Sequence, residues 1–168
     1  MMPLQGTRVL DLTMTDGYCT MELADYGAEV IKIERPGSGD PIRTRPPLKN
    51  GASPHHAFRD RGKKSVTLDL SSEKGRELFK KLVATADVVV ENFMPGTLES
   101  MGLGYDDLSA IKPELVYARL TAYGSRGPES DMPISDILAQ ARTGVMHLTG
   151  FPDGPPTRIG FSIAERFA

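Results

Sequence analysis

The chain has 168 residues, 39% hydrophobic and 25% charged, which is the composition of an ordinary globular protein. Its 20 basic and 22 acidic residues give a net charge of −2, which excludes nucleic-acid binding driven by overall charge. No apolar run approaches the roughly 20 residues that span a bilayer, and residues 1–6 lack a signal-peptide pattern, so we expect a cytoplasmic protein without a membrane partner. The single cysteine, Cys19, excludes an internal disulfide and is typical of a small buried side chain in a reducing compartment, with a nucleophile as the alternative.

Strands and helices are predicted to alternate in the first part of the chain. Residues 8–12 have the pattern of a strand, and residues 18–26 that of a helix that ends before a glycine. A second strand, with alternating apolar and polar residues, is predicted at 29–34. Residues 35–62 are rich in Pro, Gly and Arg and are interpreted as a long irregular stretch, which is typical of a functional or poorly ordered loop. A third strand is predicted at 65–70.

The clearest helix signal follows the third strand. Ser71 or Ser72 can cap a helix in which four apolar residues share one face, namely Leu78, Phe79, Leu82 and Val83. The remaining predicted elements are a strand at 86–91, short helices at 97–101 and 105–111, a strand at 115–120 and a helix at 134–143. Strands separated by helices predict an α/β fold with a parallel sheet and right-handed crossovers, here as a single domain over residues 1–168.

The fourth predicted strand ends in a promising position for a site. Its run of three valines, Val88–Val90, predicts a strand that is buried on both faces, and Asn, Pro and Gly follow it. Ligands of open α/β sheets bind just beyond the carboxyl ends of the strands. Asn92 offers hydrogen-bond donors and an acceptor, and Phe93 offers a flat apolar face, which together suit a heteroaromatic ring such as adenine. An ordinary strand-to-helix turn is the alternative interpretation.

Basic residues gather around the irregular stretch. The run Arg59–Lys64 precedes the third strand, and Arg35, Arg43 and Arg45 lie in the same region. Arginine forks and lysine ammonium groups suit phosphates, so we interpret the set as an anion site, with a solvated loop as the alternative. The glycine-rich and Walker-type phosphate fingerprints are absent from the turn after the first strand, residues 13–17.

Two further features of the sequence bear on chemistry. His55 and His56 are adjacent, and no Cys or carboxylate stands at metal-ligand spacing beside them, so no metal site is predicted. Glu165 follows a glycine-bearing apolar segment, residues 160–164, and is a candidate nucleophile. A surface glutamate without a function is the alternative for Glu165.

Taken together, the sequence resembles the family III CoA-transferases, the formyl-CoA transferase and carnitine CoA-transferase type, over nearly its whole length. The segments that carry the resemblance are 6–12, 23–40, 63–70, 91–98, 102–105 and 149–156. The resemblance implies a Rossmann-like parallel sheet with helices on both faces, as the N-terminal part of a longer fold. The small domain and the C-terminal return segment of that fold are absent from these residues, since chains of the family are much longer.

The resemblance also implies roles for individual residues. Those implied in contact with CoA are Arg35 and Lys63 at its phosphates, Asn92, Phe93 and Met94 at its adenosine, and Tyr123 and Gly124 along its channel. Glu165 stands at the position of the family nucleophile, which is an aspartate in other members. CoA and acyl-CoA are implied as substrates, with no prosthetic group and no metal.

The implied reaction moves CoA between an acyl-CoA and a small carboxylic acid. The active-site carboxylate attacks the thioester to give a mixed anhydride, CoA thiolate then gives an enzyme thioester, and the acceptor acid repeats these steps in reverse. The implied assembly is an interlocked homodimer, or a pair in which a second chain supplies the C-terminal half.

Three departures from the family pattern leave alternatives open. Glu165 replaces the aspartate, residues 14–17 form a shorter turn than in formyl-CoA transferase-like members, and Ser100 stands where some members have an arginine. A non-catalytic fragment that binds CoA or a partner is therefore the main alternative. The α-methylacyl-CoA racemases of the same family use a His-Asp pair, which corresponds to Ser135–Asp136 here, so the loss of the histidine favours the transferase.

Overall fold

The computed structural model describes residues 1–15, 17–132 and 135–167, with the side chains of Glu165 and Phe167 outside the description. The chain divides into two compact units, residues 1–120 and residues 121–168. The assignment of both units to a single domain stays a prediction.

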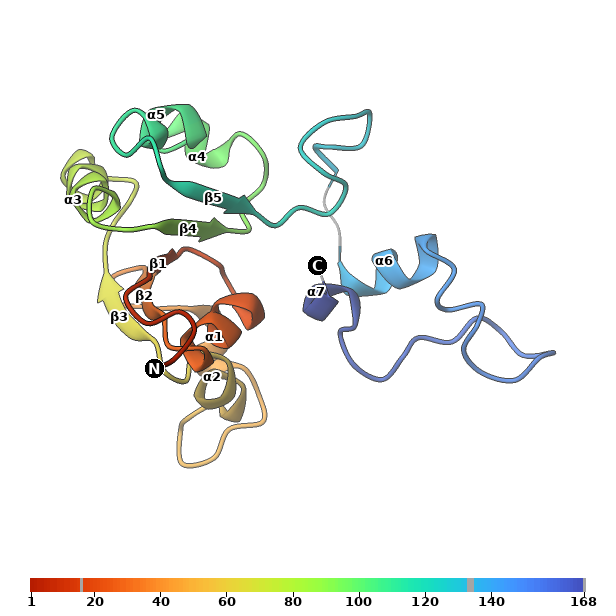
Figure 1. Ribbon diagram of the computed structural model, residues 1–168. Helices are drawn as coiled ribbons and strands as arrows, with labels where there is room; N and C mark the ends of the chain where they lie inside the picture. Colours follow the sequence, from red (N-terminus) through yellow and green to blue (C-terminus); the bar gives the residue numbers. More distant parts are fainter. Residues whose placement is uncertain (16, 133–134, 168) are drawn as a thin grey trace. The chain divides into compact units, whose positions relative to one another are not determined.

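The first unit is built on a five-stranded parallel sheet, as the α/β pattern predicted (Figure 1). Its strands are β1 (Arg8–Asp11), β2 (Glu29–Glu34), β3 (Lys64–Thr67), β4 (Val88–Glu91) and β5 (Val116–Arg119). The order across the sheet is β3-β2-β1-β4-β5, in which Leu10 of β1 pairs with Ile31 on one side and Val89 on the other. The chain direction across the sheet reverses between β1 and β4, which is where α/β sheets of this kind open a crevice for ligands.

Helices cover both faces of this sheet, which confirms the predicted layers. They are α1 (Tyr18–Asp25), the 3₁₀ helix η1 (Pro41–Thr44), α2 (Pro54–Arg59), α3 (Glu73–Val83), α4 (Thr97–Ser100) and α5 (Tyr105–Ser109). On one face, Leu10 and Val89 share a core with Phe79 of α3, Leu98 of α4 and Leu108 of α5. On the other face, side chains of α1 pack against the valines of the central strands.

The capping signal before α3 is confirmed. The Ser72 hydroxyl accepts a hydrogen bond from the Gly75 backbone N–H at 3.1 Å, and Phe79 and Val83 are fully buried. Leu78 was predicted on the same helix face but is exposed. The side chains from residue 78 to residue 83 spread over a wider part of the helix surface than the part that contacts the sheet. Gly75 is required at its position, since a Cβ there would lie 1.8 Å from the Asp69 carbonyl oxygen.

One prediction about the region after β2 was wrong. Residues 35–62 contain η1 and α2 instead of being irregular throughout, because a proline at the first helical position of each presets the backbone for a helix. The strand predicted at 29–34 is confirmed as β2, and its polar residues Lys32 and Glu34 are buried. Their burial is possible because each is paired with opposite charges, as described below.

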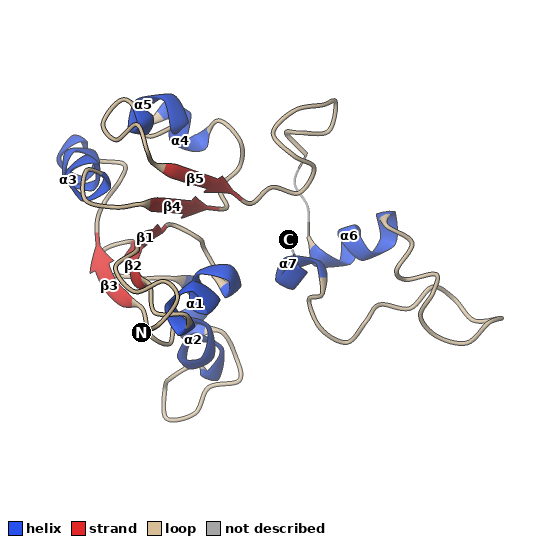
Figure 2. Cartoon of the chain, viewed as in Figure 1, coloured by secondary structure: helices blue, strands red, loops and turns tan. Residues whose placement is uncertain are grey.

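The second unit consists largely of loops, with two short helices, α6 (Asp136–Arg142) and α7 (Ala164–Phe167) (Figure 2). Helix α6 confirms the helix predicted at 134–143, of which residue 134 lies outside the described residues. Gln140 is the one buried residue among those described in this unit. In the described parts of both units, no helix has the length and apolarity needed to cross a membrane.

Candidate functional site

A cavity of about 470 Å³ opens in the first unit beyond the carboxyl ends of its strands. It is lined by Leu12, Thr13, Met14, Ile33, Glu34, Arg35, Pro36, Ser38, Gly39, Asp40, Leu68, Asp69, Leu70, Ser71, Phe93, Leu98 and Met101. Its volume lies in the range of small-molecule and cofactor sites, and its walls combine apolar side chains with a few polar groups, as such sites do. The carboxyl ends of β1, β2 and β4 contribute to it, which is the position predicted for a ligand site.

Arg35 is the cation available at this cavity. It follows β2 directly, is exposed, and its guanidinium has no hydrogen bond or ion pair with any residue that the structure describes. The neighbouring Glu34 is satisfied by Arg43, whose Nε and Nη2 donate to its carboxylate at 2.7 and 2.6 Å. These bonds lower the pKa of Glu34 to about 2. Because Arg43 pairs with Glu34, Glu34 is not free to engage the neighbouring Arg35.

Asn92 and Phe93 follow β4 at its cavity end, but their side chains make different contacts. The Phe93 side chain lines the cavity, whereas the Asn92 amide is bonded to the turn after β1. Asn92 Oδ1 accepts from the Met14 N–H at 2.8 Å, and its Nδ2 donates to the Met14 carbonyl at 3.1 Å. Asn92 therefore shapes the cavity wall. Met94 is about half exposed and does not line the cavity.

Lys63 is engaged within the protein. Its side chain is buried, and its Nζ donates to Asp11 Oδ2 at 2.9 Å, to Asp60 Oδ1 at 3.1 Å and to the Gly17 carbonyl at 3.0 Å. An ammonium group has three hydrogens to donate, so these acceptors use them all. Lys63 is an internal counter-ion in this structure, and its role at the phosphates stays a prediction.

The basic run around Lys63 is likewise engaged within the protein. Arg59 is buried and its Nη1 donates to the Thr15 carbonyl at 2.8 Å. Arg61 pairs with Asp25, and Lys64 pairs with Glu29. Each of these cations is therefore bonded to a carboxylate or a carbonyl group of the protein, and the interpretation of the run as a phosphate site stays a prediction.

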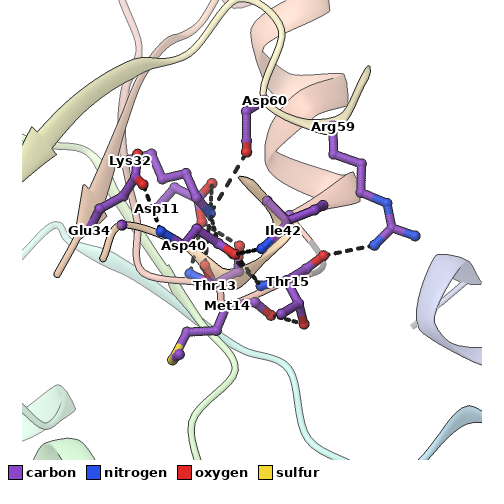
Figure 3. Close-up of polar contacts among 12 residues, drawn as sticks. Asp11, Thr13, Met14, Thr15, Lys32, Glu34, Asp40, Ile42, Arg59 and Asp60 are labelled. Carbon is purple, nitrogen blue, oxygen red and sulfur yellow. Dashed lines mark hydrogen bonds and ion pairs between the residues drawn. The ribbon is translucent and has the colours of Figure 1, made fainter. Parts of the chain in front are cut away.

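Beneath the cavity wall lies a buried cluster of charges that the sequence reading missed (Figure 3). Lys32 Nζ lies 2.9 Å from Asp40 Oδ2, 3.9 Å from Asp11 Oδ2 and 3.8 Å from Asp60 Oδ1. Burial alone raises the pKa of Asp11, but Lys32 and Lys63 outweigh it and hold that pKa below its usual value. Burial lowers the pKa of Lys32, and the three carboxylates outweigh it in the opposite direction. Asp11 and Lys32 are therefore both charged at neutral pH.

One histidine, His56, lies beside this cluster. His56 Nδ1 is 2.7 Å from Asp60 Oδ2, and its Nε2 is 3.0 Å from Arg43 Nη1, so His56 joins two ion pairs. Since Arg43 can only donate, His56 Nε2 accepts and Nδ1 carries the hydrogen. Within the described part of the chain, no three His, Cys, Asp or Glu side chains are grouped as a metal site requires.

The remaining expected site residues belong to the second unit. The Tyr123 ring is covered by the Arg142 guanidinium at 5.0 Å, and Gly124 has a positive φ of 81°. Glu165 lies within α7, and its side chain falls outside the described residues. Asp136 accepts a hydrogen bond from the Ala164 N–H at 2.8 Å and so fixes the backbone just before Glu165.

Comparison with known proteins identifies a matching family, similar curated proteins and similar solved structures. The model of CoA-transferase family III matches residues 4–167. The chain is 44% identical to mouse succinyl-CoA:glutarate CoA-transferase, covering 98% of this chain and 38% of that protein. It is also 44% identical to acetyl-CoA:oxalate CoA-transferase of Acetobacter aceti, covering 94% of this chain and 41% of that protein. A crystal structure of a CAIB/BAIF family protein from Brucella suis superposes with a TM-score of 0.93 at 40% identity, over 99% of this chain and 46% of that one. The chain thus spans less than half the length of each of these relatives.

Proposed function

Because the chain belongs to CoA-transferase family III, we propose that it forms part of an enzyme that moves CoA from an acyl-CoA donor to a carboxylic acid acceptor. The observation that carries the proposal is the cavity of the first unit, with its apolar walls and, at its edge, the guanidinium of Arg35, which pairs with no described residue. The relatives named for transfer to glutarate and to oxalate support a small carboxylic acid as the acceptor.

We assign the adenosine end of CoA to this cavity. Phe93 and Leu70 offer apolar surface to the adenine ring, and Arg35 offers a bidentate donor to a phosphate. Met94 follows Phe93 and extends the same wall toward solvent in this proposal. Asn92 contributes by holding the turn after β1, and Tyr123 and Gly124 are assigned to the passage of the CoA arm.

We assign the chemistry to Glu165. Its carboxylate attacks the thioester carbonyl, the C–S bond breaks, and CoA leaves as a thiolate from a glutamyl-acyl anhydride. The thiolate then attacks the glutamyl carbonyl, releasing the donor acid and leaving a glutamyl-CoA thioester. The acceptor carboxylate attacks that thioester and displaces the CoA thiolate, which gives a second glutamyl-acyl anhydride. The thiolate then attacks the acyl carbonyl of this anhydride, which forms the new acyl-CoA and frees the Glu165 carboxylate. These steps need no prosthetic group. A glutamate reaches about 1 Å farther than an aspartate, and such a displacement costs on the order of 10²-fold in rate.

CoA binding tests the first half of the proposal. The protein as it occurs in its source is titrated with CoA by calorimetry, beside the Arg35→Gln and Arg45→Gln variants. A charge-assisted contact predicts a loss of about 10- to 100-fold in affinity for Arg35→Gln. Arg45 is exposed and does not line the cavity, so its variant is the matched control and keeps the original affinity. An unaltered protein that does not bind CoA refutes the proposal.

Transfer from an acyl-CoA to an isotopically labelled acid tests the second half. Glu165→Gln keeps CoA binding and loses transfer, while Glu165→Asp accelerates it. The glutamyl-CoA intermediate is sought as a mass increase of the intact protein. If CoA binds and neither the unaltered protein nor Glu165→Asp transfers it, the protein is a non-catalytic CoA-binding module instead.

We further propose that the enzyme works in the cytoplasm as a homodimer, or together with a second chain that supplies the rest of the fold. The resemblance to interlocked family members supports this assembly. The intact mass of the protein from its source, followed by light scattering of the native particle, separates the two arrangements. A monomer without a partner chain would contradict both.

A further inference from the structure

The turn between β1 and α1 contains a strained residue. Thr15 has a φ of 64°, in the left-handed region that a β-branched residue rarely adopts. Its backbone is nevertheless held on both sides. The N–H lies 3.2 Å from each carboxylate oxygen of Asp40, and the carbonyl accepts from Arg59 Nη1 at 2.8 Å (Figure 3). Strain of this kind persists only where surrounding groups fix it.

The two preceding residues of the turn are held as well. The amide of Asn92 bonds both the N–H and the carbonyl of Met14. The Thr13 carbonyl accepts from Lys32 Nζ at 2.8 Å, and its N–H donates to Asp11 Oδ1 at 2.9 Å. Every residue from 13 to 15 is thus fixed by side chains from other segments of the chain.

The groups that hold the turn are themselves firmly placed. Asp40 and Arg59 are each 5% exposed, and Asp40 forms an ion pair with Lys32 at 2.9 Å. Thr13, Met14 and Asp40 line the cavity, so the conformation of the turn determines the shape of one cavity wall.

We infer that Arg59, Asp40 and Asn92 are positioning residues, which hold the turn Thr13–Thr15 in its strained conformation and so keep the cavity ready to receive CoA. This rests on the proposed function, in which CoA is the ligand of the cavity. Without these bonds, Thr15 leaves the left-handed region in most molecules. Only the molecules that keep it there have a cavity wall shaped to bind CoA. The apparent affinity falls in proportion to the fraction of such molecules.

A double-mutant cycle tests the inference in the protein as it occurs in its source. Arg59→Met keeps the apolar stem and removes the donor to Thr15. From the cost of a left-handed non-glycine residue, we expect about tenfold weaker CoA binding by calorimetry. Glycine adopts the left-handed region freely, so in the Thr15→Gly background the same Arg59→Met change costs only about twofold. A purely structural role for Arg59 predicts the same loss in both backgrounds.

A matched control tests whether the effect on CoA affinity is specific to this turn or is shared by other left-handed residues. Asn50 is the other non-glycine residue with positive φ among those described, at 53°, and it is exposed and absent from the cavity lining. Asn50→Gly is expected to leave CoA affinity unchanged. If Arg59→Met does not fold, Asn92→Ala replaces it in the same cycle, with the same rescue expected from glycine at position 15.

The outcomes distinguish this inference from the proposed function. If the unaltered protein binds CoA and the losses are equal in both backgrounds, the inference is overturned and the proposed function stands. If the unaltered protein does not bind CoA, the proposed function and the inference about CoA fall together. Amide hydrogen exchange provides a readout without ligand: the Met14 and Thr15 amides should exchange about tenfold faster in Arg59→Met, and unchanged exchange would contradict the holding role.

Discussion

The two units of the chain are stabilised in different ways. Every buried apolar side chain that the structure describes belongs to residues 1–120. In residues 121–168 the one buried residue described is the amide Gln140, while Leu148 and Phe151 are 86% and 88% exposed. The first unit therefore has a hydrophobic core of its own, and the order of the second depends more on hydrogen bonds.

The polar interiors of the two units also differ in kind. The first unit buries ions, with Lys32 and Lys63 among three aspartates. The second buries a neutral group: Gln140 Nε2 donates to Asp136 Oδ2 at 2.6 Å, and its Oε1 accepts from the Ile159 N–H at 2.8 Å. Buried charges are costly when one partner is removed, whereas a buried amide costs only its hydrogen bonds. The comparison predicts effects of different size and different pH dependence.

The largest effect is expected from Lys32→Met. This change leaves Asp40 and the Thr13 carbonyl buried without their partner, which costs about 3–5 kcal/mol of unfolding free energy. Urea denaturation followed by circular dichroism measures it. Lys74→Met, on the exposed side of α3, is the matched control and should change stability little. A loss below about 1 kcal/mol for Lys32→Met would show that the buried cluster contributes little.

Acid is expected to destabilise the first unit through Glu34. Its pKa is about 2 in the folded protein against an ordinary value of 4.5. A lowered folded pKa contributes stability that is complete above pH 4.5 and is lost as the pH falls toward 2. We expect the loss to be about 2–3 kcal/mol, because Arg43 is partly exposed and solvent screens the pair.

Glu34→Gln checks this assignment. The variant is less stable than the unaltered protein at pH 6, and it loses less stability between pH 4.5 and pH 2. Urea midpoints measured across this range in both proteins give the comparison. Identical slopes would assign the acid sensitivity to other carboxylates, such as Asp11, whose pKa is also lowered.

A smaller and local effect is expected from Gln140→Met. The change keeps the length of the side chain but removes the hydrogen bonds of Gln140 to the Ile159 N–H and to Asp136, at a cost of about 1–3 kcal/mol. Hydrogen exchange at Ile159 and Ala164 should accelerate, while exchange in β1 stays the same. Gln5→Met, exposed in the first unit, is the control. Faster exchange in β1 would mean that the two units do not open independently.

The architecture was largely predictable because it depends on local patterns. The valine run of β4 and the serine cap of α3 each encode an element within a few residues. Helix α2 was missed because Pro54, which starts it, was taken as a loop signal. The approximate place of the site was also predictable, since Arg35 and Phe93 follow strands of a parallel sheet.

The division of roles among the basic residues was not predictable from the sequence. Lys63 and Arg59 look like any loop cations until the fold brings Asp11 and Thr15 to them from more than forty positions away. The one signal available was Lys32, a charge at the centre of a strand that the α/β pattern places inside the sheet. A charge in such a strand requires buried partners, which the sequence does not identify.

The smallest effect is expected where the two units are alike, at their surface ion pairs. Arg61 pairs with Asp25 in the first unit, and Arg142 pairs with Glu129 in the second, all of them well exposed. Each guanidinium also lies over an aromatic ring, at 4.7 Å in the first unit and 5.0 Å in the second. Asp25→Asn and Glu129→Gln remove the ion pair and leave this stacking in place.

Neither substitution is expected to shift the urea midpoint measurably, at low salt or in 0.5 M NaCl, because solvent screens exposed pairs and ordering two long side chains offsets the attraction. The prediction is sharpest as a difference. If Glu129→Gln destabilised the protein while Asp25→Asn did not, the second unit would depend on its surface charges, since it lacks an apolar core among its described residues. Equal and negligible effects would instead mean that the two units differ in how their interiors are stabilised, by the ions around Lys32 in the first and by the amide of Gln140 in the second.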